Sequence, residues 1–219
     1  MPVDAFILDV DGTVATCPYD FDAMRAAVHS MAAKWGVDSA TLEVRGIIEQ
    51  IEQTADRLAE RGPSFRADAE QAVVALEVAA ARHAQLLPGA AATLTELRRR
   101  GAAIALITRN CRAATGIVLQ GLQEYDLLLT RDDVPHPKPH PDHVLRCLTA
   151  LRCSPHGSAV VGDHPYDMKA GRAADVHLCI GVRTGNSSDS SLHQAGAHAV
   201  LDSIAELPHW LSSHQESCS

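Results

Sequence analysis

The chain has 219 residues, of which 46% are hydrophobic and 21% charged, a balance that excludes intrinsic disorder and is typical of a folded globular protein. Its length is enough for one substantial core with a modest inserted subdomain, but not for two full-sized domains. The 27 acidic and 19 basic residues give a formal net charge of −8, which argues against a protein that coats nucleic acid or an anionic membrane and favours a small ligand.

Short apolar runs that are typical of buried strands recur along the chain. Between most of them lie segments of helical length and period. One such segment, Ala90–Arg100, follows Pro88, carries three arginines in its last turn and is followed by Gly101. Strands that alternate with helices predict a parallel α/β sheet. The predicted strands are Ala5–Leu8, Ala102–Ile107, Leu127–Leu129, Ala159–Val161, Val176–Val182 and Ala199–Leu201.

The interval from about Tyr19 to Leu86 is an exception, because it has no strand pattern. Apolar residues recur there at helical spacing, first from Val44 to Leu58 and again from Ala72 to Leu87. Gly62-Pro63-Ser64 is predicted as a turn between two of the helices. We therefore predict an all-helical cap at residues 17–86, inserted into an α/β core domain made of residues 1–16 and 87–219.

Polar residues stop three of the predicted strands. The first run ends in Asp9-Val10-Asp11-Gly12-Thr13, the second in Thr108-Arg109-Asn110 and the fourth in Gly162-Asp163, with Asp167 four residues further on. Between the third and fourth runs, Lys138 stands in a proline-rich stretch. Because ligands of an open parallel sheet bind at the carboxyl ends of its strands, we expect these residues to meet in one site.

Carboxylates that converge on one spot repel one another and are partly protonated unless a cation neutralises them. Their oxygens suit Mg²⁺, which keeps some waters and takes a substrate phosphate oxygen as a further ligand. Asp9 would then attack phosphorus in line and form an aspartyl-phosphate that water later hydrolyses. Asp11 would protonate the leaving oxygen and afterwards deprotonate the attacking water, and Gly12 permits the tight turn that this reach requires.

Phosphoryl transfer also needs donors around the equatorial oxygens of the phosphoryl group. Thr108 offers a hydroxyl group, and the amides after it offer N–H groups at a helix start. Lys138 offers a positive charge on backbone that the flanking prolines restrain, and its ammonium group would also hold Asp9 ionised. Arg109 and Asn110 are candidate substrate-binding residues and not catalytic ones, because side chains at such loop positions often point to solvent.

The order Asp-x-Asp-Gly-Thr, Thr, Lys-Pro and Gly-Asp-x-x-x-Asp resembles the four motifs of the haloacid dehalogenase superfamily, over Asp9 to Asp167. The insertion after the first motif and the tail from Ala199 to Leu207 are similar to the phosphoglycolate phosphatase-like branch. The resemblance implies a Rossmann-like core, a helical cap and a magnesium-dependent phosphoric monoester hydrolase. It also implies that Mg²⁺ is held by the side chains of Asp9 and Asp163 and the backbone carbonyl of Asp11, with Asp167 as direct or indirect support.

The predicted function is hydrolysis of a small phosphomonoester; phosphoglycolate, a sugar phosphate and a nucleotide all remain open as substrates. The second aspartate of the first motif favours a phosphatase over a dehalogenase, because dehalogenase relatives lack this acid/base. One alternative is a phosphomutase that uses Asp9 and Asp11 to return the phosphoryl group to a bound sugar. Another is a non-catalytic binding protein that kept the fold, which the complete motif set argues against.

Histidines near the third and fourth motifs and arginines in the predicted cap are further polar candidates. Prolines around His136 and His140 prevent the helical i, i+4 spacing of many metal-binding histidine pairs, so no zinc site is expected among His136, His140, His143 and His164. Solvated helix faces are favoured over contact with an anionic substrate for Arg57, Arg61 and Arg66.

No run of about 18 apolar residues is present, and the N-terminus reaches an acidic motif by residue 9 instead of showing a signal segment. A cytoplasmic protein without membrane partners is therefore predicted. The cysteines lack a CxxC pair and are expected to be reduced thiols: Cys17, Cys111, Cys147, Cys153, Cys179 and Cys218.

Overall fold

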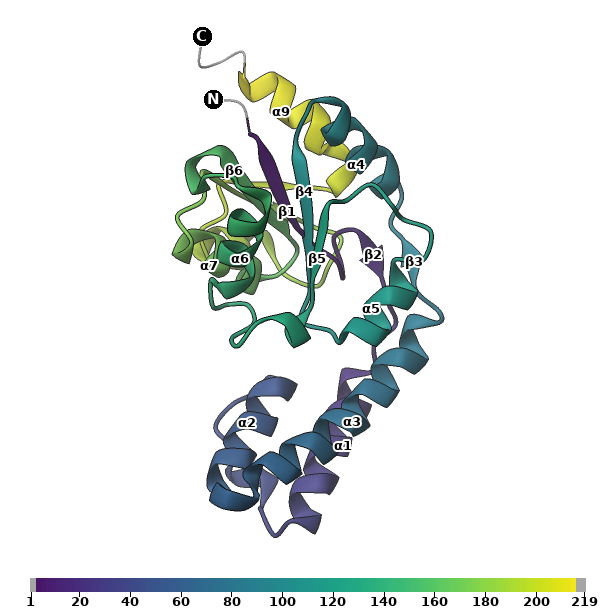
Figure 1. Cartoon of the computed structure of the whole chain (residues 1–219), viewed down its shortest axis with the longest axis vertical. Helices are drawn as coiled ribbons and strands as arrows, with labels where there is room; N and C mark the ends of the chain where they lie inside the picture. Colours follow the sequence, from purple (N-terminus) through teal and green to yellow (C-terminus); the bar gives the residue numbers. More distant parts are fainter. Residues whose placement is uncertain (1–2, 216–219) are drawn as a thin grey trace. The chain divides into compact units, whose positions relative to one another are not determined.

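The computed structural model describes residues 3–215, with side chains described as far as Ser213. The chain divides into two compact units. One is formed by Met1–Cys17 with Ala84–Ser219, and the other by Pro18–His83. We refer to them as the core unit and the helical unit (Figure 1). Within the described residues, no helix is long and apolar enough to cross a membrane.

The core unit is built on a six-stranded sheet in which all neighbouring strands are parallel. The order β5-β4-β1-β6-β7-β8 means that the chain adds strands on one side of β1 and then crosses to the other side. This sheet confirms the predicted α/β class, and each predicted strand is present to within two residues of its expected ends. The strands are β1 (Ala5–Asp9), β4 (Ala103–Ile107), β5 (Leu127–Leu129), β6 (Ser158–Gly162), β7 (Leu178–Val182) and β8 (Ala199–Leu201).

A second, two-stranded sheet joins the points at which the chain leaves and re-enters the core unit. Its strands, β2 (Ala15–Thr16) and β3 (Gln85–Leu86), are antiparallel. The prediction that no strand lies between Tyr19 and Leu86 was therefore wrong for β3. A strand of two residues is too short to show an alternating pattern in the sequence.

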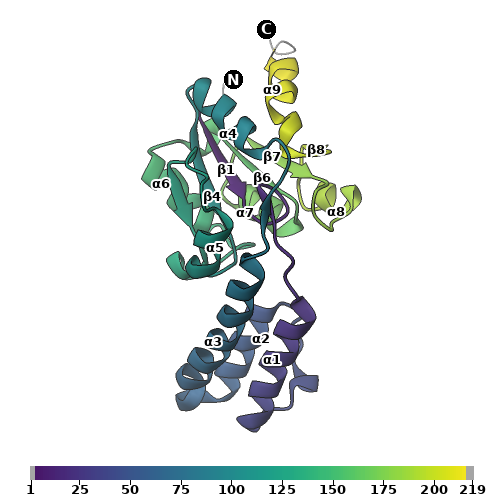
Figure 2. The ribbon, with the colours of Figure 1, turned by 90° about the vertical axis from the view of Figure 1, so that its right-hand side faces the viewer.

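Helices cover both faces of the large sheet (Figures 1 and 2). α6 (Asp142–Leu151) and α7 (Pro165–Ala173) pack together on one face, and α4 (Ala90–Arg99) with α9 (Leu207–Gln215) on the other. α4 ends as predicted just before Gly101, whose φ of +85° lies in the left-handed region that glycine adopts readily. The core unit also contains α5 (Arg112–Val118), α8 (Asp189–Gln194), η3 (Arg131–Asp133), η4 (Pro155–Gly157) and η5 (Ile204–Glu206).

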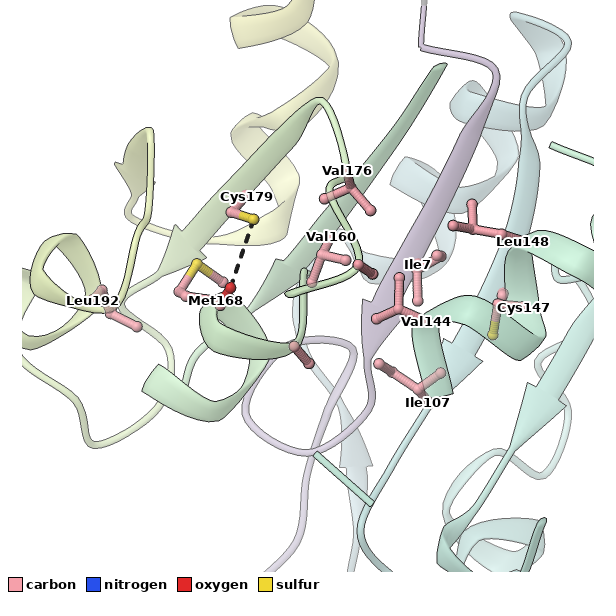
Figure 3. Close-up of a cluster of buried hydrophobic side chains, with 13 residues drawn as sticks. Ile7, Ile107, Val144, Cys147, Leu148, Val160, Met168, Val176, Cys179 and Leu192 are labelled. Atoms are coloured by element: carbon pink, nitrogen blue, oxygen red, sulfur yellow. Dashed lines mark hydrogen bonds between the residues drawn. The ribbon is translucent and has the colours of Figure 1, made fainter. Parts of the chain in front are cut away.

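An apolar cluster fills the space between the sheet and α6 and α7 (Figure 3). Strand residues such as Ile7 and Val160 meet Val144 of α6 and Met168 of α7 there, and all four are fully buried. Burial of one such side chain stabilises the fold by about 1.5–3 kcal/mol, so this layer holds both helices against the strand ends. The cysteines in the described residues form no disulfide with one another: Cys17, Cys111, Cys147, Cys153 and Cys179. Cys218 lies outside the described residues.

The helical unit has its own apolar core. Its helices pack on one another around Met24, Val28, Ile51, Phe65 and Val73, which are all buried. They are α1 (Phe21–Lys34), α2 (Ile47–Arg57) and α3 (Gly62–Ala81), with η1 (Ser39–Thr41) between α1 and α2 and η2 (Ala59–Arg61) between α2 and α3.

The turn between α2 and α3 differs from the prediction. η2 makes the turn, whereas Gly62, Pro63 and Ser64 form the first turn of α3. Proline is favoured at the first positions of a helix because its missing N–H would have no helical partner there. A Cβ on Gly62 would lie 2.3 Å from the carbonyl oxygen of Ala55, so glycine allows the two helices to approach closely.

The three arginines near this turn all have partners inside the helical unit. Arg66 donates two hydrogen bonds to Glu52, at 2.8 and 2.6 Å. Arg61 donates to the carbonyl oxygen of Trp35 at 3.0 Å, with its guanidinium group over the indole ring. Arg57 donates to the carbonyl oxygen of Thr41 at 2.7 Å. These contacts give the arginines a role in holding the helical unit together.

His143 of α6 anchors the proline-rich loop that carries Lys138. The imidazole is fully buried, and its Nε2 lies 3.0 Å from the carbonyl oxygen of Thr130 while its Nδ1 lies 3.4 Å from the backbone N–H of Lys138. These partners require a neutral ring with the proton on Nε2. Burial lowers the pKa of His143 to about 4, which maintains that neutral form.

We expect His143 to make stability fall as the pH falls. Its pKa is about 4 in the folded chain and 6.5 as the ordinary value, so between these values the unfolded chain binds a proton that the folded chain does not. Relative to His143→Gln, the wild type should lose about 2 kcal/mol of unfolding free energy between about pH 7.5 and about pH 5. Urea unfolding without added metal measures this difference.

His156→Gln is the matched control, because His156 is largely exposed. It should keep the pH dependence of the wild type. Equal losses in the wild type and in His143→Gln would show that the buried imidazole is not the titrating group.

Candidate active site

Three adjacent strands bring the sequence motifs together at one edge of the sheet. Asp9 ends β1 and lies opposite Ile107 of β4, so Thr108 follows directly beside it. On the other side Leu8 lies opposite Val161 of β6, which places Asp163 just past the end of that strand. The chain changes direction across the sheet at β1, and in open α/β sheets ligands bind at such a switch point.

Lys138 reaches into this edge and pairs with two carboxylates. Its Nζ lies 2.6 Å from Asp9 Oδ1 and 2.5 Å from Asp167 Oδ1. All three side chains are more than nine-tenths buried. Oxygens of Asp9, Asp163 and Asp167 lie within 4.8 Å of one another, so Asp163 joins the two carboxylates that pair with Lys138.

Burial, and after it the neighbouring carboxylates, raise the pKa values of all three. Burial raises the pKa of Asp9, with Asp11 adding to the effect, and the opposing charge of Lys138 does not outweigh them. Burial and the neighbouring Asp9 raise the pKa of Asp167 to about 6, and burial with both neighbours raises the pKa of Asp163 further. The ammonium group of Lys138 lowers the pKa of Asp9, but it does not bring that pKa back to its ordinary value.

This arrangement fits a divalent cation. Two buried carboxylates and the half-buried Asp163 beside a single ammonium group keep an excess negative charge that a cation would offset, and their oxygens are the ligands that Mg²⁺ prefers. Asp9, Asp163 and Asp167 can supply side-chain oxygens to it. Asp167 is also held in place by the backbone N–H of His164 at 3.0 Å, within a capping box at the start of α7.

Two glycines leave room around Asp163. A Cβ on Gly185 would lie 1.7 Å from Asp163 Oδ2, and a Cβ on Gly12 would lie 2.6 Å from the same oxygen. The φ of Gly12 is also +82°, so it needs glycine for its backbone as well. Thr184 ties the two loops together by donating a hydrogen bond from Oγ1 to the carbonyl oxygen of Gly12 at 2.5 Å.

The loop that contains Thr184 and Gly185 was missed in the sequence. This loop follows β7, and no acidic residue stands at the end of that strand to mark it. The available signal was position, because β7 is the neighbour of β6 in the sheet and its end lies at the same edge.

The carboxylate of Asp11 accepts hydrogen bonds from two residues of the second motif. Thr108 Oγ1 donates to Asp11 Oδ2 at 3.0 Å, and Asn110 Nδ2 donates to the same oxygen at 2.6 Å. The Thr108 hydroxyl group in turn accepts a hydrogen bond from the backbone N–H of Asn110 at 3.1 Å. Thr108 and Asn110, both named from the sequence as substrate contacts, are thus placed to orient the carboxylate of Asp11.

Arg109 turns to α7. Its guanidinium group stacks over the ring of Tyr166, 4.9 Å from the ring centroid, and its carbonyl oxygen accepts a hydrogen bond from Arg131. The structure thus brings Asp9, Lys138, Asp163 and Asp167 into one cluster and joins Asp11 to Thr108 and Asn110 beside it.

Comparisons with known proteins agree with this architecture. The family described as haloacid dehalogenase-like hydrolase matches residues 3–175. The plasmid phosphoglycolate phosphatase of Cupriavidus necator is 30% identical over 219 residues, which is 95% of this chain and 93% of that protein. The pyrophosphatase PpaX of Bacillus velezensis is 38% identical over 120 residues, 53% of this chain and 55% of that protein.

A crystal structure of a hydrolase from Pseudomonas syringae has the same fold. It superimposes with a TM-score of 0.68 at 22% identity and covers 96% of this chain and 98% of that chain. The family match includes all four motifs, and the relative from Cupriavidus necator is similar along nearly the whole length. The chain therefore belongs to the haloacid dehalogenase-like hydrolases.

Proposed function

We propose that the protein is a magnesium-dependent phosphatase that hydrolyses a small phosphomonoester through an aspartyl-phosphate on Asp9. The observation that carries this proposal is the cluster of Asp9, Asp163 and Asp167 beside the buried Lys138, with Asp11 oriented next to it by Thr108 and Asn110. Phosphoryl transfer depends mainly on positioning and on charge stabilisation, and this cluster provides both.

Asp9 is the nucleophile in this proposal. Its Oδ1 is held by Lys138, which leaves the second carboxylate oxygen as the attacking atom. Attack forms a bond between that oxygen and phosphorus while the bond from phosphorus to the leaving oxygen breaks. Lys138 stabilises the negative charge that develops on the phosphoryl oxygens, because its ammonium group is fixed by two ion pairs.

Asp11 is the acid and base. In its protonated form it donates the proton to the leaving oxygen, and as a carboxylate it then takes a proton from the water that cleaves the aspartyl-phosphate. The donors Thr108 and Asn110 both bind Oδ2, so they fix the plane of the carboxyl group.

Mg²⁺ would be held by Asp9, Asp163 and Asp167, with the backbone carbonyl of Asp11 as a further oxygen. When bound, it supplies positive charge that neutralises the carboxylates and the phosphoryl oxygens. The glycines at 12 and 185 leave Asp163 the space to keep this position.

The similarity to a phosphoglycolate phosphatase over nearly the whole chain makes phosphoglycolate the first substrate to test. The shorter similarity to a pyrophosphatase adds pyrophosphate to the panel. A sugar phosphate and a nucleotide complete it, and a sugar phosphate that is isomerised without phosphate release would indicate the phosphomutase alternative.

Asp9→Asn should lower the rate of phosphate release by at least about a thousand-fold, because the amide cannot act as the nucleophile. Asp11→Asn should lower it by about 100- to 10 000-fold, because the acid and base is lost. The measurement is phosphate release from the substrate panel with Mg²⁺ and with EDTA.

Asp68→Asn is the control for these two variants, because Asp68 is exposed on α3. It should retain the activity of the wild type. Full activity in EDTA, or in Asp9→Asn, would contradict the proposed mechanism.

Gly185→Ala should raise the Mg²⁺ concentration needed for half-maximal activity by about ten-fold or more, because the new methyl group would displace Asp163. Gly116→Ala is the matched glycine change, since the added Cβ in α5 would meet no atom within 4 Å outside its chain neighbours and its own helix backbone. It should leave the Mg²⁺ requirement unchanged. An unchanged requirement in Gly185→Ala would argue against Asp163 as a metal ligand.

A further inference from the structure

A second group of potential metal ligands lies on the loop that carries Lys138. His136, His140 and Asp142 each offer a ligand atom, and these atoms lie within 4.8 Å of one another. The proposed magnesium cluster consists of carboxylates, whereas this group has two imidazole rings and one carboxylate. Imidazole nitrogens favour first-row transition ions such as Zn²⁺ over Mg²⁺.

The two histidines share one carboxylate. His136 Nδ1 lies 3.0 Å from Asp142 Oδ2, and His140 Nδ1 lies 2.9 Å from Asp142 Oδ1. The centroids of the two rings are 4.7 Å apart, with the ring planes inclined at 43°. Two nitrogens and at least one oxygen therefore converge from separate residues on a small volume.

The backbone explains how the group forms without a helix. The backbone N–H of His140 donates a hydrogen bond to the carbonyl oxygen of Pro137, with 3.2 Å between nitrogen and oxygen, and this bond closes a turn in the loop. This turn brings His140 back beside His136, and Asp142 follows as the first residue of α6. The prediction of no zinc site considered only helical spacing, and the turn provides a different route to the same proximity.

We propose that His136, His140 and Asp142 form a binding site for a transition-metal ion, with Zn²⁺ as the probe. A tetrahedral zinc ion binds nitrogen and oxygen at about 2.0–2.2 Å, so two of its ligand atoms lie about 3.4 Å apart. The ligand atoms here lie within 4.8 Å of one another, so they need to move by at most about 1.4 Å to fit such an ion. The His136 and His140 side chains are 66% and 50% exposed, so they have room to rotate by that amount.

Metal binding at this site needs little chemical change. In the metal-free chain each Nδ1–H donates to Asp142, and the ion takes the place of these protons. A neutral ring can move its proton from Nδ1 to Nε2 and bind the ion through Nδ1. Water would fill the remaining coordination positions, because the site is open to solvent.

The site is distinct from the proposed active site although it shares the loop. Lys138 lies between the two histidines in the chain. Its side chain is buried and forms ion pairs with Asp9 and Asp167, whereas both imidazoles are exposed. A bound ion would thus connect the two ends of the loop on its solvent side.

Isothermal titration of tag-free protein with Zn²⁺, in excess Mg²⁺ to saturate the carboxylate cluster, tests the proposal. The wild type should bind one Zn²⁺ ion that excess Mg²⁺ does not displace. His136→Ala and His140→Ala should each weaken that binding by about ten-fold or more, and the double variant should lose it. His156→Ala should bind as the wild type does, because His156 has a single carboxylate, Asp175, 4.0 Å away.

Two results would overturn the proposal: wild-type affinity in the double variant, or loss of all zinc binding in excess Mg²⁺. Histidine ring ¹⁵N spectra give a readout that does not depend on heats of binding. Zn²⁺ should shift the Nδ1 resonances assigned to His136 and His140 by comparison with their variants. Unshifted resonances for both rings would also reject the site. The single variants change exposed side chains, and circular dichroism verifies that they are folded.

Discussion

The ion pairs of Lys138 with Asp9 and Asp167 are the interactions on which the proposed active site depends. Buried carboxylates are costly, and three of them near one another are more costly still unless cations face them. The ammonium group offsets part of this cost but leaves the pKa values of the carboxylates raised. The core unit therefore holds its most polar residues in a state that favours a second cation.

The surrounding structure serves to hold that cluster in place. His143 links the loop of Lys138 to Thr130, which follows β5, and the backbone N–H of His164 holds the carboxylate of Asp167 at the start of α7. Thr184 joins the loop after β7 to the loop after β1. None of these three residues belongs to the acidic cluster, yet each binds a cluster residue or a loop next to one. Losing such a contact would move a ligand without changing its chemistry.

The arginines of the helical unit and the histidines near the third motif have different roles in the folded chain. The arginines near the turn of the helical unit bind partners in that unit, so their charges are used in its own stability. The histidines near the third motif separate by environment. His143 is buried and neutral, while His136 and His140 face solvent around one carboxylate. The arginines thus stabilise the helical unit, His143 is a buried neutral residue, and the exposed His136 and His140 share one carboxylate partner.

The sequence by itself determined the parallel sheet, the inserted helices and the residues of the acidic cluster. Each of these depends on local information: apolar runs of strand length, helical spacing, and polar residues at strand ends, which parallel strands must place at one edge. Motif order then predicted Asp9, Asp11, Lys138 and Asp163 as site residues and not as ordinary turn residues.

Only the tertiary structure decided the contacts between segments that are distant in the chain or joined by irregular turns. Gly185 is required beside Asp163 because two strand-end loops meet, and no pattern around Gly185 records that approach. His136 and His140 meet through a turn whose geometry depends on its backbone hydrogen bond. Local patterns report the periodicity of one element, whereas these distances depend on how several elements pack, which is why they became visible only in the folded chain.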